Sequence, residues 1–189
     1  GFLKTQFSLE TALFDEQASR AYILNSAVTH WINQDTDGLW PGVDWRKDAL
    51  VPVVGVLDNP REAVQEPLTF NLKRTHLAIF GESVWGKTNF LQTLLLSLAA
   101  THSPDEFQAY ILDLAGREYR NIEALHHVGT AIYADDELFE ERMQRLFSKL
   151  EQIAAERAQI FSETDAATFA EFNAQNPDQV LPGIVVIID

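Results

Sequence analysis

The residues of this chain best suited to chemistry form one short loop, Gly81-Glu82-Ser83-Val84-Trp85-Gly86-Lys87-Thr88. Its spacing matches G-x-x-x-x-G-K-[ST], the pattern of loops that cradle the phosphates of a nucleoside triphosphate. The apolar run 76–80 before it predicts a short buried strand, and the run 89–100 after it predicts a buried helix. This context suits phosphate binding, because the first N–H groups of a helix have no partner within the helix.

Each position of the loop has an expected role. Gly81 and Gly86 are expected to allow turns that a Cβ would obstruct, so that the N–H groups of the loop point inward. Lys87 is expected to reach the β- and γ-phosphates, and the Thr88 hydroxyl to bind Mg²⁺. We therefore predict a site for ATP and Mg²⁺ built from Gly81, Glu82, Ser83, Val84, Trp85, Gly86, Lys87, Thr88 and Asn89. The alternative is a plain turn before a core helix, with Lys87 in solvent.

A second set of chemical groups lies at the ends of apolar runs, where Asp113 and Asp189 are found. A phosphate-loop enzyme needs one carboxylate at such a strand end to hold its magnesium ion. We favour Asp189, because the run 184–188 before it is wholly apolar, whereas Asp113 follows a mixed segment. Lys87 and Asp189 are thus the expected catalytic pair, with Thr88 and Asp189 as metal ligands.

Other reactive residues have simpler interpretations. His126 and His127 are adjacent and lack a third ligand at metal-binding spacing, so we expect a loop pair before a strand. Arg117 and Arg120 follow a strand end and could face a phosphate or a neighbouring subunit, but surface ion pairs are expected. Trp40 and Trp45 are expected to pack their loop onto the domain.

The overall composition limits the class of protein. The chain has 189 residues and a formal net charge of −14, from 28 acidic and 14 basic residues. This charge argues against a broad nucleic-acid-binding surface, because phosphate contacts require clustered Lys and Arg. There is no cysteine, no segment that resembles a signal peptide and no apolar run long enough to span a bilayer. A soluble, cytoplasmic protein is expected, with any membrane anchor in segments outside this chain.

The order of the predicted elements indicates the fold class. Residues 1–50 are read as an entry region with a helix over about 17–32, and residues 51–189 as the main domain. Strands over 51–57 and 68–72, joined by a turn at 58–62, predict a hairpin. Further elements are a strand at 107–112, a short helix at 119–125, a strand at 128–133, an amphipathic helix from about 135 and a helix at 166–173. Alternation of this kind predicts an α/β fold with a mainly parallel sheet.

The segment 184–188 is the most uniformly apolar and β-branched run of the chain. Such a run predicts a central parallel strand covered on both faces. Few domains end on their most buried strand, so we expect this sequence to be part of a longer ATPase, cut after the strand that carries Asp189.

Several motifs in sequence order resemble the FtsK/SpoIIIE family of motor ATPases, and most closely the ATPase modules of type VII (ESX-like) secretion. They cover about residues 50–189. Beyond the phosphate loop, the resemblance rests on the segments 53–60 (Val-Val-Gly-Val-Leu-Asp-Asn-Pro), 94–104, 111–117 (Ile-Leu-Asp-Leu-Ala-Gly-Arg) and 125–129 (Leu-His-His-Val-Gly).

This resemblance implies a RecA-like core that binds ATP and Mg²⁺ within a chain of several ATPase modules. It also implies assembly into a ring, typically a hexamer, with nucleotide between subunits. A secreted protein is the expected substrate. A duplex DNA translocase, and a module that binds nucleotide or peptide without turnover, remain the alternatives. The loop departs from the family pattern at Val84, where glycine is common because φ is often positive, and at the bulky Trp85.

Overall fold

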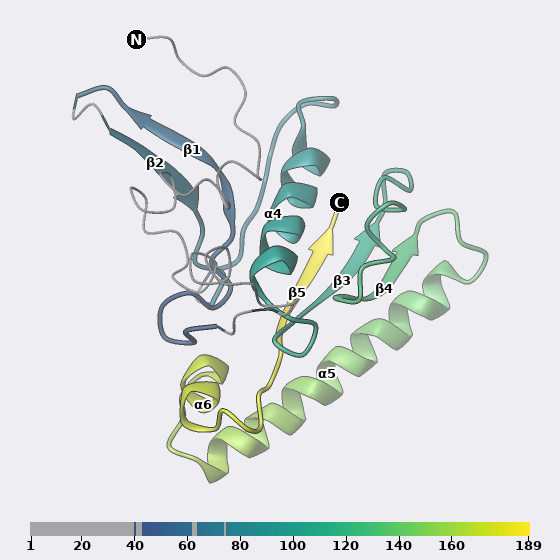
Figure 1. The fold of residues 1–189 in the computed structure, drawn as a ribbon. Helices are drawn as coiled ribbons and strands as arrows, with labels where there is room; N and C mark the ends of the chain where they lie inside the picture. The colour runs from purple at the N-terminus through teal and green to yellow at the C-terminus, as the bar shows by residue number, and fades with distance from the viewer. Residues whose placement is uncertain (1–39, 41–42, 62–63, 74) are drawn as a thin grey trace. The chain divides into compact units, whose positions relative to one another are not determined.

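The computed structural model describes residue 40 and residues 43–61, 64–73 and 75–189 (Figure 1). The helix expected over 17–32 lies outside the described residues. Contacts within the chain divide it into an N-terminal unit, which runs to Ser103, and a C-terminal unit, which runs from Pro104 to Asp189. Each unit is described separately.

The N-terminal unit contains the predicted hairpin and the helix that follows the phosphate loop. Strand β1 (Val53–Asn59) pairs antiparallel with β2 (Val64–Thr69), which confirms the hairpin with a later turn than expected. Helix α4 (Lys87–Thr101) packs on β1, and the Ser97 hydroxyl accepts the Val53 backbone N–H at 2.8 Å. The helix predicted from the apolar run 89–100 is therefore confirmed and extends to the loop itself.

The two tryptophans before the hairpin pack as expected. Trp45 is only 8% exposed, and the indole N–H of Trp40 donates to the Ala99 carbonyl of α4 at 3.0 Å. A packing role for this pair within the N-terminal unit is confirmed.

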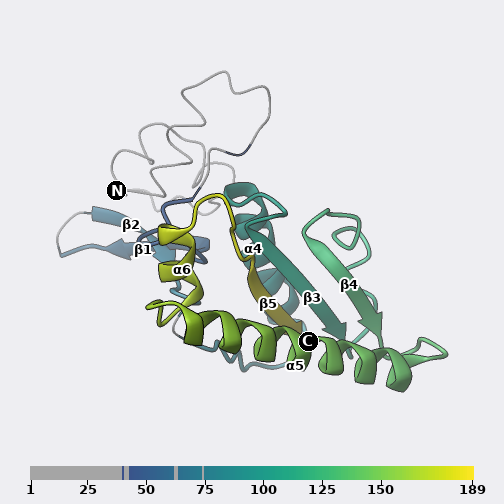
Figure 2. The ribbon, with the colours of Figure 1, turned by 90° about the horizontal axis from the view of Figure 1, so that it is seen from below.

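The C-terminal unit is a parallel sheet with helices (Figures 1 and 2). Strands β3 (Phe107–Asp113), β4 (Val128–Tyr133) and β5 (Gly183–Ile188) are all parallel and lie in the order β4-β3-β5. Because parallel strands point the same way, the loops after β3 and β4 and the end of β5 share one edge of the sheet. Asp113 and Asp189 both lie at this carboxyl edge.

Two helices complete this unit. The long helix α5 (Phe139–Glu163) lies along the sheet. Its predicted apolar stripe is buried at Leu146 and half-buried at Phe139, Met143, Leu150, Ile153 and Ile160. Leu146 forms a core with Leu112 and Ile132, and Phe139, Met143 and Leu150 pack against it. The short helix α6 (Phe169–Gln175) begins after Thr168, whose hydroxyl accepts the Glu171 N–H at 3.2 Å.

Three expectations about elements are wrong. Segment 76–80 pairs with none of the described strands, and four of its five residues are exposed. A short apolar run indicates strand propensity, but a strand also needs the N–H and C=O groups of a neighbour. Segment 119–125 forms successive turns, because only the Glu123 N–H to Tyr119 carbonyl bond has helical i+4 spacing and the others are i+3.

The third error concerns β5. In the described sheet it is an edge strand rather than a central one. Its alternate residues differ: Ile187 is 3% exposed, whereas Val186 and Ile188 are 37% and 57% exposed. Side chains of a strand alternate between faces, so one face is buried here and the other is not. In the described residues, no helix has both the length and the apolar character needed to cross a lipid bilayer.

Candidate functional site

The phosphate loop turns into α4 through two residues with left-handed backbone conformation. Gly86, the residue that caps α4, has φ 82°, and Val84 has φ 69°. Gly86 thus has the kind of turn that was expected of it, a backbone conformation that residues with a Cβ rarely adopt. Gly81 differs, because its φ is not in the left-handed region and a Cβ there would meet its nearest atoms at 3.9 Å, an ordinary contact. The positive φ that the family pattern places at the fourth position of the loop is therefore present, although valine occupies it.

Lys87 is held over its own loop. Its ammonium donates to the carbonyl of Gly81 at 3.0 Å and to that of Glu82 at 2.8 Å. An ammonium has three donors, so an anion seated on the loop could receive a further bond from Lys87. The side chain is thus positioned at the loop rather than extended into solvent.

The N-terminus of α4 lacks both groups that commonly balance the free N–H groups at the start of a helix, a side-chain cap and an acidic residue in the first turn. By contrast, α6 is capped by Thr168, and α5 carries Glu140 and Glu141 in its first turn. Since the first N–H groups and the positive dipole end of α4 are left without an acidic partner, this end of the helix suits a phosphate.

The loop also presents exposed apolar groups. Val84 is 97% exposed, Trp85 is 74% exposed and Phe80 just before the loop is 91% exposed. Large apolar side chains exposed this close together in sequence are unusual on a soluble surface. They belong to the loop and to the residue before it.

At the carboxyl edge of the sheet in the C-terminal unit, Asp113 is fully buried and acts as a cap for the loop that follows it. Its carboxylate accepts backbone N–H groups from Ala115 at 3.0 Å, Gly116 at 2.9 Å and Glu118 at 2.8 Å. A carboxylate with both oxygens accepting such bonds is a structural group. This geometry supports the choice of Asp189 over Asp113 as the metal carboxylate.

Asp189 is held in place by both its main chain and its side chain. Its N–H donates to the Leu112 carbonyl at 3.0 Å, and its carbonyl accepts the Leu114 N–H at 2.7 Å. The side-chain atom Oδ2 accepts the hydroxyl of Tyr119 at 3.0 Å. Burial, and then the negative charge of Asp189, raise the pKa of Tyr119, so the phenol remains a donor.

Sequence reasoning missed Tyr119. Position 119 lies in the loop after β3, and nothing in its spacing relates it to a residue 70 positions later. A tyrosine in a loop at the carboxyl edge of a parallel sheet was the only available signal.

Arg117 is an ion-pair residue, as expected. Its Nε lies 2.7 Å from Asp135 Oδ2, its terminal nitrogen lies 3.5 Å from Asp136, and its guanidinium lies over the Tyr133 ring at 5.3 Å. Arg117 also has a positive φ of 59°. Arg120 is exposed. These contacts tie the loop after β3 to the segment that leads into α5.

The two histidines behave as a loop pair. His126 is exposed and His127 is 3% exposed, and both lie in the turn before β4. Across the described ranges there is no cluster of three or more His, Cys, Asp or Glu side chains that could hold a metal ion.

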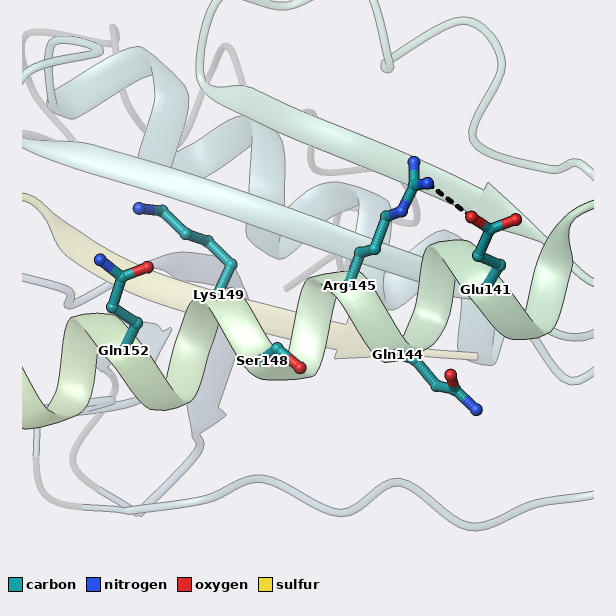
Figure 3. Close-up of a pocket in the computed structure, with 6 residues that line it drawn as sticks. All are labelled: Glu141, Gln144, Arg145, Ser148, Lys149 and Gln152. Carbon is teal, nitrogen blue, oxygen red and sulfur yellow. Dashed lines mark hydrogen bonds and ion pairs between the residues drawn. The ribbon is translucent and has the colours of Figure 1, made fainter.

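A shallow hollow lies on the outer face of α5 (Figure 3). It is lined by residues of this one helix: Glu141, Gln144, Arg145, Ser148, Lys149 and Gln152. Glu141 and Arg145 form an i,i+4 ion pair, and the other side chains point in different directions. The spacing is that of a solvated helix face.

The structure thus gathers residues 81–89 in the N-terminal unit and places Asp189 and Tyr119 in the C-terminal unit. The first set has the chemistry to bind phosphate, through a lysine and uncapped helical N–H groups. The second set has a carboxylate of the kind that binds Mg²⁺.

Comparison with known proteins agrees with this chemistry. The model of the FtsK/SpoIIIE family matches residues 46–188. The chain is 34% identical over 140 residues to the ESX-3 secretion system protein EccC3 of Mycobacterium tuberculosis, which covers 72% of this chain and 10% of that protein. It is 31% identical over 133 residues to the ESX secretion system protein EccC of Thermomonospora curvata, covering 69% of this chain and 10% of that protein.

Solved structures give the same result. ATPases 2 and 3 of Thermomonospora curvata EccC, solved with a signal sequence peptide, match with a TM-score of 0.66 and 26% identity, over 75% of this chain and 26% of that one. ATPases 2 and 3 of Geobacillus thermodenitrificans EssC match with the same values. The expected α/β P-loop fold is confirmed. The chain spans about a tenth of the length of the EccC proteins that it matches.

Proposed function

Because this chain belongs to the FtsK/SpoIIIE family, we propose that it is an ATP-binding motor module that couples ATP hydrolysis to protein secretion. The observation that carries this proposal is the loop geometry at the start of α4. Val84 and Gly86 have φ of 69° and 82°, and Lys87 lies over the loop. Its relatives belong to secretion systems, which supports protein secretion as the process in which the module acts.

In this proposal the N–H groups of residues 81–89 and the Lys87 ammonium bind the β- and γ-phosphates. Thr88 and Asp189 hold the magnesium ion, whose charge neutralises phosphate oxygens during transfer to water. Asp113 takes no part, since its carboxylate already caps the loop after β3.

The proposed partners follow from the relatives. EccC and EssC have been solved with at least two ATPases in one chain, and one structure includes a signal sequence peptide. We propose that this module works beside other ATPase modules and neighbouring subunits in a ring, most simply a hexamer, and that a secreted protein is the substrate. A solved relative is the cytoplasmic domain of the Thermomonospora curvata secretion ATPase, which supports the cytoplasm as the location.

Two other functions make different predictions. A duplex DNA translocase would show salt-sensitive DNA binding, against which the net charge of −14 argues. A module that binds nucleotide without turnover is favoured by one observation, the β-branched Val84 in a left-handed conformation next to the exposed Trp85. In that case nucleotide would bind with no hydrolysis in the intact assembly.

Nucleotide titration tests the proposal directly. The Kd of ATP with Mg²⁺ is measured for the wild type, for Lys87→Ala and for Lys149→Ala, which removes an exposed lysine from α5. Since a charged hydrogen bond contributes about 1.5–3 kcal/mol, Lys87→Ala should weaken binding roughly 10- to 100-fold, and Lys149→Ala should not. Unchanged binding by Lys87→Ala would rule out the role of the phosphate loop.

Substrate class is tested by turnover in the full-length protein. Addition of a secreted protein substrate should stimulate ATP hydrolysis, and duplex DNA should not. Stimulation by DNA alone would identify a DNA translocase instead, and no hydrolysis with either would favour the binding-only module.

A further inference from the structure

Tyr119 is a buried tyrosine whose hydroxyl meets the proposed metal carboxylate. Its side chain is 0% exposed, and its hydroxyl donates to Asp189 Oδ2 at 3.0 Å. The two residues belong to different segments of the C-terminal unit, the loop after β3 and the end of β5. Buried polar groups in proteins are almost always hydrogen-bonded, and the Tyr119 hydroxyl finds its partner in Asp189.

The loop is built so that Tyr119 reaches Asp189. The three N–H groups bound by Asp113 fold residues 114–118 back over the end of β3. Two residues in this fold, Gly116 and Arg117, have φ of 155° and 59°. After the fold, the Tyr119 carbonyl accepts the N–H groups of Ile122 and Glu123, both at 2.9 Å, which fixes the main chain on the other side of the tyrosine.

The backbone of Asp189 is held by hydrogen bonds to residues on either side of Asp113. It continues the β3–β5 ladder through Leu112 and Leu114, at 3.0 and 2.7 Å. With its main chain held, the remaining freedom of Asp189 is rotation of its carboxylate. The Tyr119 hydroxyl removes that freedom, because it binds one named oxygen.

We propose that Tyr119 is a positioning residue for Asp189: it holds Oδ2 and leaves Oδ1 as the oxygen offered to the magnesium ion or to a water bound to it. This inference rests on the proposed function, in which Asp189 serves the metal. Because Oδ2 already accepts the Tyr119 hydroxyl, Oδ1 keeps its full accepting capacity, and binding of the metal through one oxygen is favoured over binding through both. That suits Mg²⁺, which demands octahedral geometry and keeps its waters, better than Ca²⁺, which readily takes both oxygens of a carboxylate.

The chain provides a matched control in Tyr133. This tyrosine lies at the end of the neighbouring strand β4, and its hydroxyl donates to Glu123 Oε2 at 2.6 Å. Tyr133→Phe therefore removes the same kind of bond from the same edge of the sheet without changing Asp189. Tyr119→Phe keeps the buried ring and removes only the hydroxyl.

The experiment measures the Kd of a non-hydrolysable ATP analogue in EDTA, in Mg²⁺ and in Ca²⁺. The wild type, Tyr119→Phe, Tyr133→Phe, Asp189→Asn and the Tyr119→Phe/Asp189→Asn double variant are compared. Tyr119→Phe should leave the Kd in EDTA unchanged and reduce the gain in affinity from Mg²⁺ about tenfold. Its gain from Ca²⁺ should fall less, so the ratio of the two gains shifts toward Ca²⁺. Tyr133→Phe should match the wild type.

The double variant separates positioning from a general loss of folding. If Tyr119 acts through Asp189, Tyr119→Phe has no further effect on the Mg²⁺ gain once Asp189 is asparagine. An equal effect in both backgrounds would overturn the proposal, because a folding defect does not depend on Asp189.

The remaining outcomes distinguish this inference from the function on which it rests. Loss of the Mg²⁺ gain in Asp189→Asn, with the gain intact in Tyr119→Phe, overturns the role of Tyr119 and leaves the proposed function standing. A Mg²⁺ gain that survives in Asp189→Asn removes Asp189 from the metal site, and the positioning role of Tyr119 then fails. ATP binding by the phosphate loop is judged separately, by Lys87→Ala.

Discussion

His102 accepts a hydrogen bond from the backbone N–H of Leu50, with 3.2 Å between that nitrogen and Nε2. Leu50 has φ 51° and is 3% exposed, and His102 is 0% exposed. Because Nε2 is the acceptor, the ring proton lies on Nδ1, which is 3.1 Å from the Leu98 carbonyl. One buried histidine thus joins the last turn of α4 to a strained backbone just before the hairpin.

Replacing this histidine should destabilise the N-terminal unit. His102→Ala leaves the buried Leu50 N–H without its acceptor, so the free energy of unfolding should fall by about 1–3 kcal/mol. Chemical denaturation measures the change, with His126→Ala as the control because His126 is exposed. Equal stabilities of the two variants would show that the Leu50 contact contributes little.

Val84→Gly should stabilise the protein. A side chain in the left-handed region costs about 1–2 kcal/mol, and Val84, at 97% exposed, gains little from packing. Glycine removes this cost but adds about 0.5–1 kcal/mol of unfolded-state entropy, so a net gain of up to about 1.5 kcal/mol is expected. Val56→Gly in β1 makes the same change in an extended strand and should destabilise. A lower denaturation midpoint for Val84→Gly would contradict this account of the loop.

Gly129→Ala should destabilise the sheet. A Cβ at Gly129 would lie 2.7 Å from Tyr110 Cε1 and 3.1 Å from Cζ, so the Tyr110 ring must move. The expected loss is about 1–3 kcal/mol, measured by denaturation. Gly55→Ala, where a Cβ meets nothing within 4 Å, should change stability by less than about 0.5 kcal/mol. If Tyr110→Leu does not relieve the effect of Gly129→Ala, the close contact is not its cause.

Arg117→Met should raise the pKa of Asp135. The Arg117 hydrogen bond is the main reason that the pKa of this exposed carboxyl lies below its ordinary value of 3.8. A lowered pKa means that the pair stabilises the fold above pH 3.8 and that this contribution disappears as the pH falls through the lowered value. NMR titration of the Asp135 carboxyl carbon measures the shift. Arg145→Met, which removes the partner of Glu141, should leave the titration of Asp135 unchanged.

Local patterns in the sequence predicted most of the elements. The two strands of the hairpin, the helix over the apolar run 89–100 and the amphipathic helix from about 135 were each expected from the sequence, and the structure contains each as β1 and β2, α4 and α5. Strand 128–133 was predicted with the same bounds that the structure gives it. These features depend on neighbours within a few residues, which is where sequence patterns carry information.

The errors share a physical cause. Whether segment 76–80 joins a sheet, and whether both faces of β5 are covered, depends on partners that are distant along the chain. The seven residues 119–125 have helical composition, but the turns that bring the Tyr119 hydroxyl to Asp189 compete with a helix. Composition does not reveal such competition.

By itself, the sequence determined the phosphate loop and the order of most strands and helices, and it predicted Asp189 as the metal carboxylate, because each rests on residue types at short spacing. Only the tertiary structure decided that Asp113 caps a loop, that Val84 takes the left-handed conformation and that Tyr119 holds Asp189. Each of these features depends on how a side chain or a stretch of backbone is oriented. Packing and hydrogen bonding set that orientation, and position in the sequence does not.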